Sequence, residues 1–233
     1  MNILSLGDKV VREKIYKGED VYAKFNFDQT KVDMQGWGSD HLILPWTIEQ
    51  LKPNLIIEVG SWKGRSAINM AKKLELLSID GEILCIDTWL GSPEHWLAED
   101  WAWDSLRMCN GRPNLYDTFM NNVIANQCEK YITPFSLTSE AAYFVLKKLS
   151  IKSSMIYIDA GHEYESVIKD IEMYLHLLEE GGVMILDDYI SWSGVTKAVN
   201  EFALKNNIQP FGESGKVVLN KNSSLNYSTK IVF

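Results

Sequence analysis

Cysteine is scarce in this chain, and the cysteines that are present form no recognisable pattern. There are three in 233 residues: Cys85, Cys109 and Cys128. An odd number without metal-ligand spacing speaks against a disulfide framework and a cysteine-based metal site. It suits a protein of a reducing compartment.

Long apolar segments are also missing. No run of residues approaches the length needed to span a membrane. Residues 1–15 carry charges and lack the apolar core of a signal peptide. We therefore expect a cytoplasmic protein without membrane association.

Basic residues are fewer than acidic ones. The chain has 23 Lys and Arg against 31 Asp and Glu, a formal net charge of −8, and no dense basic cluster. This speaks against general binding of nucleic acids or anionic membranes. Hydrophobic residues make up 46% and charged residues 23%, which is typical of a globular protein, and the length suits one large α/β domain.

The most informative stretch of the chain is residues 55–66, LIIEVGSWKGRS. A buried strand ends at Glu58, a turn with Gly60 and Gly64 follows, and a helix over 65–77 comes next. Glycines let the backbone approach a ligand, and a helix N-terminus offers unpaired N–H groups to a carboxylate or phosphate. The pattern predicts a strand–turn–helix unit that cradles a nucleotide-like cofactor.

Apolar runs and helical periodicities alternate along the rest of the chain, which predicts a Rossmann-like doubly wound α/β fold with a mostly parallel sheet of about seven strands. Further strands are expected at 83–87, 131–135, 155–158 and 183–186, and two or three short ones in 208–233. Further helices are expected at 115–125, 139–149, 164–178 and 194–206, with Gly181-Gly182 ending the third.

Two segments lie outside this alternation. We expect residues 1–50 to form an N-terminal extension or lid, and 51–233 to form the main domain. Residues 88–114 predict a loop-rich insertion after the second strand, with four tryptophans. These rings pack a cap or form a lid that stacks on an acceptor molecule, and the sequence leaves both open. The tryptophans are Trp89, Trp96, Trp101 and Trp103.

The glycine turn discriminates between cofactors. A dinucleotide fingerprint has a middle glycine where this chain has Trp62, which disfavours a pyrophosphate. The chain resembles the class I S-adenosylmethionine-dependent methyltransferases, whose first strand reads acidic-x-Gly-x-x-x-Gly, here residues 58–64. The resemblance implies that the turn holds the methionyl part, Asp87 the ribose and 135–139 the adenine. Two carboxylate oxygens also match a vicinal diol.

Taken singly, Glu58 is equally consistent with a turn cap and Asp87 with a solvated strand end; the combination with the glycines favours the cofactor. The full set of implied S-adenosylmethionine contacts is Glu58, Gly60, Ser61, Trp62, Gly64, Ser66, Asp87, Thr88, Thr138, Ser139 and Asp159.

Carboxylates also end the later strands. Asp159 follows the strand at 155–158, and Asp187-Asp188 follow the strand at 183–186. Because the carboxyl ends of parallel strands meet at one edge, three oxygen donors there predict a site for Mg²⁺ or another divalent cation. His162 lies on the same loop as Asp159 and is a candidate general base. Asp187-Asp188 as a turn cap and His162 as a structural hydrogen bonder remain alternatives.

These residues resemble a narrower group, the metal-dependent O-methyltransferases of the macrocin (TylF-like) and mycinamicin type with their cephalosporin-hydroxylase-named relatives. The shared pattern is Asp-x-x-His-x-Tyr, here 159–164, then Asp170, and Gly-Gly-x-x-x-x-Asp-Asp-Tyr, here 181–189. The resemblance implies metal ligation by Asp159, Asp187 and Asp188, with His162 and Asp159 as catalytic residues. We expect Asp170 on the surface of its helix.

The sequence therefore predicts an S-adenosylmethionine-dependent O-methyltransferase that acts on a small hydroxylated molecule, sugar or catechol-like, with help from a divalent metal. Rival hypotheses are a metal-dependent hydroxylase or hydrolase on the same scaffold, a non-catalytic protein that binds the cofactor or a glycan, and a dinucleotide dehydrogenase. The aromatic N-terminal segment makes a homo-oligomer an additional expectation.

Overall fold

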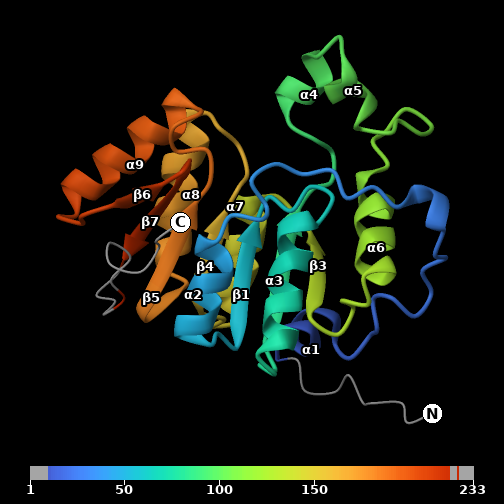
Figure 1. The fold of residues 1–233 in the computed structure, drawn as a ribbon, viewed down its shortest axis with the longest axis horizontal. Coiled ribbons are helices and arrows are strands. Elements are labelled where there is room, and N and C mark those ends of the chain that lie inside the picture. Colours follow the sequence, from blue (N-terminus) through green and yellow to red (C-terminus); the bar gives the residue numbers. More distant parts are fainter. Residues whose placement is uncertain (1–9, 221–224, 226–233) are drawn as a thin grey trace.

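A seven-stranded sheet forms the centre of the molecule (Figure 1). In this computed structural model, residues 10–220 and residue 225 are described. The strand order is β3-β2-β1-β4-β5-β7-β6; β1 to β5 run parallel, and β7 runs antiparallel to both β5 and β6. The strands are β1 (Leu55–Val59), β2 (Glu82–Asp87), β3 (Ile132–Ser136), β4 (Ser153–Ile158), β5 (Leu178–Leu186), β6 (Phe211–Glu213) and β7 (Lys216–Asn220).

The order reverses between β1 and β4, because the chain moves from β1 outward to β3 and then returns to the other side of β1. The crevice for a ligand in an open α/β sheet lies at the carboxyl ends of the strands that flank such a reversal. The fold therefore places the ends of β1 and β4 at the expected ligand site. The predicted doubly wound α/β fold is confirmed.

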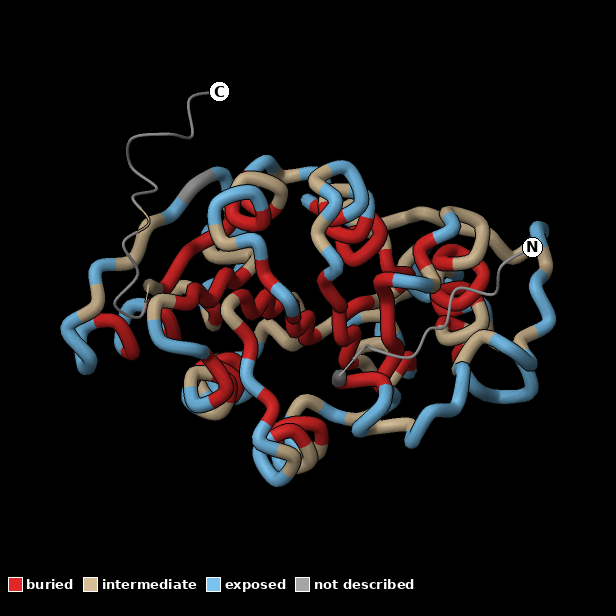
Figure 2. Tube along the Cα trace, turned by 90° about the horizontal axis from the view of Figure 1, so that it is seen from below, coloured by how far each residue is buried: buried red, intermediate tan, exposed pale blue. Residues whose placement is uncertain are grey.

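Helices cover both faces of the sheet. Along β1, Ile56 packs in the cluster on one face, whereas Ile57 and Val59 pack in the cluster on the other. This alternation buries the sheet on both sides, as the red core of Figure 2 shows. One face carries α2 (Ile43–Leu51), α3 (Arg65–Leu76) and α6 (Leu115–Ala125); the other carries α7 (Ser139–Lys148), α8 (Tyr164–Leu175) and α9 (Ser193–Lys205).

The N-terminal segment runs from the amino ends of the strands to their carboxyl ends (Figure 1). At the amino-terminal edge of β3, Arg12 of α1 (Val10–Tyr16) is buried and donates from Nε to Thr133 Oγ1 at 3.0 Å. After the short helix η1 (Gln29–Lys31), Asp33 accepts a 2.7 Å bond from the buried Lys63 at the opposite edge. Residues 35–39 then line the cavity described below.

The insertion after β2 contains two short helices, α4 (Pro93–Leu97) and α5 (Trp101–Asp104), which project beyond the carboxyl edge of the sheet (Figure 1). Trp89 is different from the other tryptophans of this segment. It is 2% exposed, and its Nε1 donates to the carbonyl of Trp62 at 2.9 Å. This residue anchors the insertion to the glycine turn.

The predicted helix 164–178 is too long, and its proposed glycine stop is wrong. The helix ends at Leu175, and Gly181-Gly182 lie inside β5. The register between β4 and β5 shifts in this stretch. Ser153 of β4 pairs with Leu178 of β5, and the next pair is Met155 with Val183, so β5 contains extra residues here. The left-handed Gly181, with φ +76°, therefore serves a bulge and not a helix cap.

The other predicted helices, and the predicted strands apart from 183–186, agree with the structure to within two residues at each end. The short C-terminal strands correspond to β6 and β7, and part of the predicted range lies outside the described residues. The helices α1 and α2 were not predicted. Among the described residues, every helix is too short or too polar to cross a membrane.

Candidate active site

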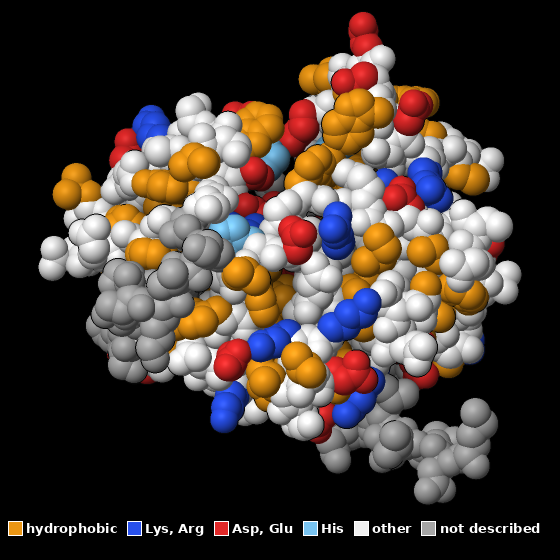
Figure 3. Space-filling view, viewed as in Figure 1, with side chains coloured by type: hydrophobic (Ala, Val, Ile, Leu, Met, Phe, Trp, Pro, Cys, Tyr) orange, Lys and Arg blue, Asp and Glu red, His pale blue; other side chains and the backbone are white. Residues whose placement is uncertain are grey.

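A cavity of about 1030 Å³ opens at the carboxyl edge of the sheet. Its walls come from the glycine turn, the ends of β2, β4 and β5, the N-terminal loop 35–39 and the insertion. In Figure 3, acidic and histidine side chains gather in a hollow between the α9 side of the molecule and the projecting α4–α5 segment. The volume suits a cofactor together with part of a second substrate.

Gly60 lies where two halves of this cavity meet. One half is formed around the glycine turn after β1, and the other is formed at the ends of β4 and β5. Gly60 has φ +86°, and a Cβ atom there would lie 1.9 Å from the carbonyl oxygen of Asp159. Only glycine allows this approach. The turn after β1 and the loop after β4 are consequently packed backbone against backbone.

Asp87 holds the turn that follows Gly60. Its Oδ2 accepts bonds from the N–H groups of Ser61 and Trp62 at 2.9 and 2.8 Å, and its Oδ1 accepts from Trp89 N at 2.7 Å. Burial raises the pKa of Asp87, and these N–H groups oppose that rise. The carboxylate lines the cavity, as the sequence predicted, and it also fixes the shape of the turn.

Glu58 lies beneath the turn, fully buried, and does not line the cavity. Its two oxygens accept bonds from the hydroxyls of Ser61 and Ser66, each at 2.6 Å. Burial raises the pKa of Glu58, and the hydroxyl donors oppose that effect. Glu58 therefore supports the turn from behind.

Gly64 is also absent from the cavity wall. A Cβ atom at Gly64 would lie 2.8 Å from the ring of Phe119, so glycine is needed there for packing. The other predicted cofactor residues all line the cavity: Gly60, Ser61, Trp62, Ser66, Asp87, Thr88, Thr138, Ser139 and Asp159.

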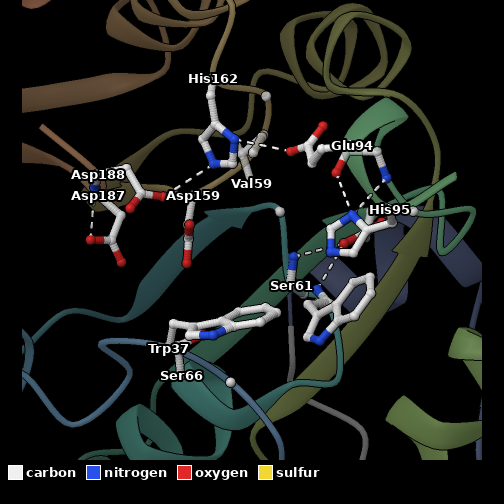
Figure 4. Close-up of a pocket in the computed structure, with 18 of the residues that line it drawn as sticks. Trp37, Val59, Ser61, Ser66, Glu94, His95, Asp159, His162, Asp187 and Asp188 are labelled. Carbon is white, nitrogen blue, oxygen red and sulfur yellow. Dashed lines mark hydrogen bonds and ion pairs between the residues drawn. The ribbon is translucent and has the colours of Figure 1, made fainter. Parts of the chain in front are cut away.

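The second half of the cavity contains a group of possible metal ligands. One donor atom each from Asp159, His162 and Asp188 lies within 4.8 Å of the others. Figure 4 shows both carboxylates beside the His162 ring. Two carboxylates and an imidazole suit a divalent cation, so this part of the site fits the predicted metal.

Asp187, the third predicted ligand, also lines the cavity but is not a member of that group. Its Oδ2 accepts a 2.6 Å bond from the hydroxyl of Tyr157 and forms an ion pair with Lys216, and its Oδ1 accepts from Asp188 N at 2.8 Å. Burial, and then the charges of Asp159 and Asp187, raise the pKa of Tyr157 well above its usual value, so the phenol remains a donor.

His162 is held between two carboxylates on opposite sides of its ring (Figure 4). Its Nε2 lies 3.1 Å from Asp188 and its Nδ1 3.0 Å from Glu94, and the ring stacks on Trp192 with centroids 4.3 Å apart. Burial lowers the pKa of His162, but the hydrogen bond with Asp188 and the surrounding carboxylates outweigh it, and the net pKa is raised. Glu94 comes from α4 and was not among the predicted site residues.

Aromatic rings form the outer wall. Trp62 stacks on His95 with centroids 4.4 Å apart, and Trp37 lies 5.6 Å from Trp101. Of the four tryptophans in the insertion, only Trp101 lines the cavity. The aromatic wall therefore combines Trp37 of the N-terminal loop and Trp62 of the glycine turn with His95 and Trp101 of the insertion. Trp37 was not among the predicted site residues.

Asp170 lies in the cavity wall and not on the surface of α8. It is 4% exposed, which makes the predicted surface position wrong. Burial raises the pKa of Asp170 to about 6, against the effect of a hydrogen bond with Ser139. It borders the part of the cavity where Thr138 and Ser139 lie.

Solved structures with a similar fold are methyltransferases. CalS11, a calicheamicin methyltransferase, is 17% identical over 76% of each chain, with a TM-score of 0.56. An O-methyltransferase from Bacillus cereus in complex with SAH is 14% identical, over 95% of this chain and 92% of that chain, with a TM-score of 0.55. TomG from Streptomyces achromogenes, an O-methyltransferase involved in tomaymycin synthesis and solved with SAM, is 11% identical over 95% and 91%, with a TM-score of 0.55. These likenesses confirm the predicted class I methyltransferase fold.

A curated relative, "Uncharacterized protein R132" of Acanthamoeba polyphaga mimivirus, is 35% identical over 65 residues, which is 27% of this chain and 29% of that protein. The chain thus matches under a third of that relative's length. A family model described as a methyltransferase domain matches residues 57–189, more than half of the chain. The predicted enzyme class is confirmed, whereas the narrower macrocin-type grouping stays a prediction: the chain belongs to the methyltransferase domain family.

Proposed function

We propose that this protein transfers the methyl group of S-adenosylmethionine to a hydroxyl of a small molecule, and that a divalent cation held by Asp159 and Asp188 assists. The supporting observation is the junction at Gly60, which sets the glycine turn directly against the loop of Asp159 in one cavity. A cofactor in the first half and an acceptor in the second would meet there. The macrocin-type grouping is part of this proposal.

The proposed reaction is a direct displacement. The acceptor oxygen forms a bond to the methyl carbon while the carbon–sulfur bond breaks, and the electron pair stays on sulfur. The acceptor proton passes to His162. The two halves of the site contribute chiefly by holding oxygen and methyl carbon in line.

A bound divalent cation would lower the pKa of an acceptor hydroxyl and offset the negative charge of the cluster. The second effect matters for His162, whose pKa the surrounding carboxylates raise. An imidazole that is already protonated cannot accept the acceptor proton. A second positive charge beside Asp188 would lower this pKa and free the base.

The charge of the cavity narrows the class of acceptor. Six carboxylates line it, against one arginine and two histidines. This excess of negative charge disfavours phosphorylated or carboxylated acceptors. We propose a neutral or cationic acceptor, such as a sugar or a catechol, that packs on the tryptophan wall. The carboxylates are Asp87, Glu94, Asp159, Asp170, Asp187 and Asp188.

The first experiment is a calorimetric titration with S-adenosylhomocysteine in excess Mg²⁺. We expect micromolar binding that Asp87→Ala abolishes and Asp87→Asn weakens less, because the amide oxygen can still accept one of the N–H groups of the turn. A folded wild-type protein that fails to bind would overturn the proposal and favour metal-only chemistry, as in the rival hydrolase hypothesis.

Acceptor screening follows, with methyl-labelled cofactor and panels of sugars and catechols. His162→Ala is expected to slow transfer by about 10²-fold or more, as for other general bases. Full activity of His162→Ala together with an inactive Asp188→Asn would remove the base assignment and keep the metal assignment. Binding of cofactor without transfer to any acceptor would support the non-catalytic rival.

The expectations of a cytoplasmic location and of a homo-oligomer stay predictions of the sequence.

A further inference from the structure

A buried lysine lies at the carboxyl edge of the sheet, and the proposed reaction does not use it. Lys216 is 1% exposed and is the first residue of β7. Because β7 runs antiparallel to β5, with Val217 opposite Leu186, Lys216 is placed next to Asp187. The turn between β6 and β7 thus delivers a cation to the acidic end of β5.

The contacts of this ammonium group are specific. Lys216 Nζ donates to Asp187 Oδ2 and, at 2.9 Å, to the hydroxyl of Tyr157. Tyr157 in turn lies 2.6 Å from Asp187 and 3.1 Å from Asp159. A Cβ atom built on Gly38 would lie 3.4 Å from Nζ, so the N-terminal loop covers the ammonium group. The ammonium group is therefore shielded from water, whereas Asp187 also borders the cavity.

This network occupies Oδ2 of Asp187 with two donors and Oδ1 with one. Oδ2 is shared by Lys216 and Tyr157, and Oδ1 accepts the N–H of Asp188. A metal ion on Oδ2 would meet a buried ammonium at hydrogen-bond distance, and like charges that close repel strongly where water is excluded. Within residues 10–220, neither Asp159 nor Asp188 accepts a hydrogen bond from a lysine; Asp159 accepts from the Tyr157 hydroxyl, and Asp188 lies 3.1 Å from His162.

We infer that Lys216 is a resident cation of the active site that neutralises Asp187 and removes it from the metal-ligand set. Asp187 and Lys216 are then positioning residues, and the metal site has two carboxylates instead of three. This inference rests on the proposed function for the presence of a metal. It predicts weak binding of Mg²⁺, which prefers several hard oxygen ligands.

The test compares two adjacent, chemically identical substitutions. Asp187→Asn and Asp188→Asn are titrated with Mn²⁺ in the presence of S-adenosylhomocysteine, and free Mn²⁺ is followed by electron paramagnetic resonance. We expect Asp188→Asn to lower the affinity by about tenfold or more and Asp187→Asn to change it by less than about threefold. Equal losses would overturn the inference, because Asp187 would then be a ligand.

Lys216→Met gives the converse result. Freed from its ammonium partner, Asp187 becomes available, and we expect affinity for Mn²⁺ and Mg²⁺ to rise by about tenfold or more. Lys205→Met, an exposed lysine of α9, is the control and should change nothing. If the wild type binds no Mn²⁺, a gain of binding in Lys216→Met still supports the inference, and no gain overturns it.

Two further measurements keep the outcomes separate. Lys216→Met removes the cation that balances the buried charge of Asp187, so the double variant Lys216→Met/Asp187→Asn is titrated as well. This double variant should bind Mn²⁺ as Asp187→Asn does. A loss of metal binding in the folded double variant contradicts the inference. Binding of S-adenosylhomocysteine reports on the proposed function: its absence in the wild type refutes that function, whatever the metal titrations give.

Discussion

The two halves of the cavity are built in different ways. The cofactor half is built mainly from one continuous strand–helix–strand unit, in which Asp87 at the end of β2 holds the turn at the end of β1, with Thr138 and Ser139 added from the loop after β3. The acceptor half is assembled from four separate parts of the chain: the ends of β4 and β5, the insertion that carries Glu94, and β7, which carries Lys216. A local motif determines the first half, whereas tertiary packing determines the second.

The largest effect is expected from a substitution at Gly60, where the two halves of the cavity meet. Gly60→Ala forces a backbone clash with Asp159 at a left-handed φ, and we expect a loss on the order of 3 kcal/mol of stability or more, with loss of S-adenosylhomocysteine binding. Gly181→Ala is the matched control: φ is +76°, no atom lies within 4 Å of its Cβ, and only the dihedral cost of about 1–2 kcal/mol remains. Thermal denaturation measures the stability of the two variants, and calorimetry measures their binding of S-adenosylhomocysteine. Equal losses in the two variants would contradict the role of Gly60 as the contact between the halves.

A second prediction concerns Asp170, whose pKa is raised to about 6. Between its ordinary pKa and 6 the folded protein binds more protons than the unfolded chain, so this group makes the protein less stable as pH rises through that window. Asp170→Asn removes the charge and should stabilise the protein at pH 7.5 by on the order of 2 kcal/mol, with little gain at pH 4.

The control for this prediction is Glu172→Gln, which changes an exposed carboxylate of the same helix. Denaturant unfolding at both pH values gives the free energies. A gain from Asp170→Asn that does not vary with pH would show that the carboxylate is not the cause.

The smallest expected effect should be confined to the acceptor half of the cavity. Glu94→Gln removes one of the carboxylates that raise the pKa of His162, and that pKa should fall by about one unit or less. NMR titration of the His162 ring measures this, and the signal is assigned with His162→Ala. S-adenosylhomocysteine binding should not change, because Glu94 belongs to the acceptor half. The exposed Glu99 of the same insertion, changed to Gln, should leave the His162 titration as it is.

The sequence predicted the sheet and the cofactor half because their signals are local. Gly60 and Asp87 lie at the ends of neighbouring strands of a single unit, and apolar runs mark those strands. It missed Glu94 and Lys216, since no periodicity connects α4 or β7 to the end of β5. Asp170 was misplaced because a polar residue on an amphipathic helix is ordinarily exposed, and here α8 turns it toward a cavity.

The N-terminal segment has a consequence for where this domain begins. Arg12 is bound at the amino edge of the sheet, and Gly38 covers the Lys216 ammonium at the carboxyl edge. The family match starts at residue 57, after both. A fragment cut at that boundary would expose the amino edge of β3 and hydrate the ion pair of Asp187. The family match therefore leaves out residues whose contacts tie both ends of the sheet together, Arg12 at the amino ends of the strands and Gly38 at the carboxyl ends.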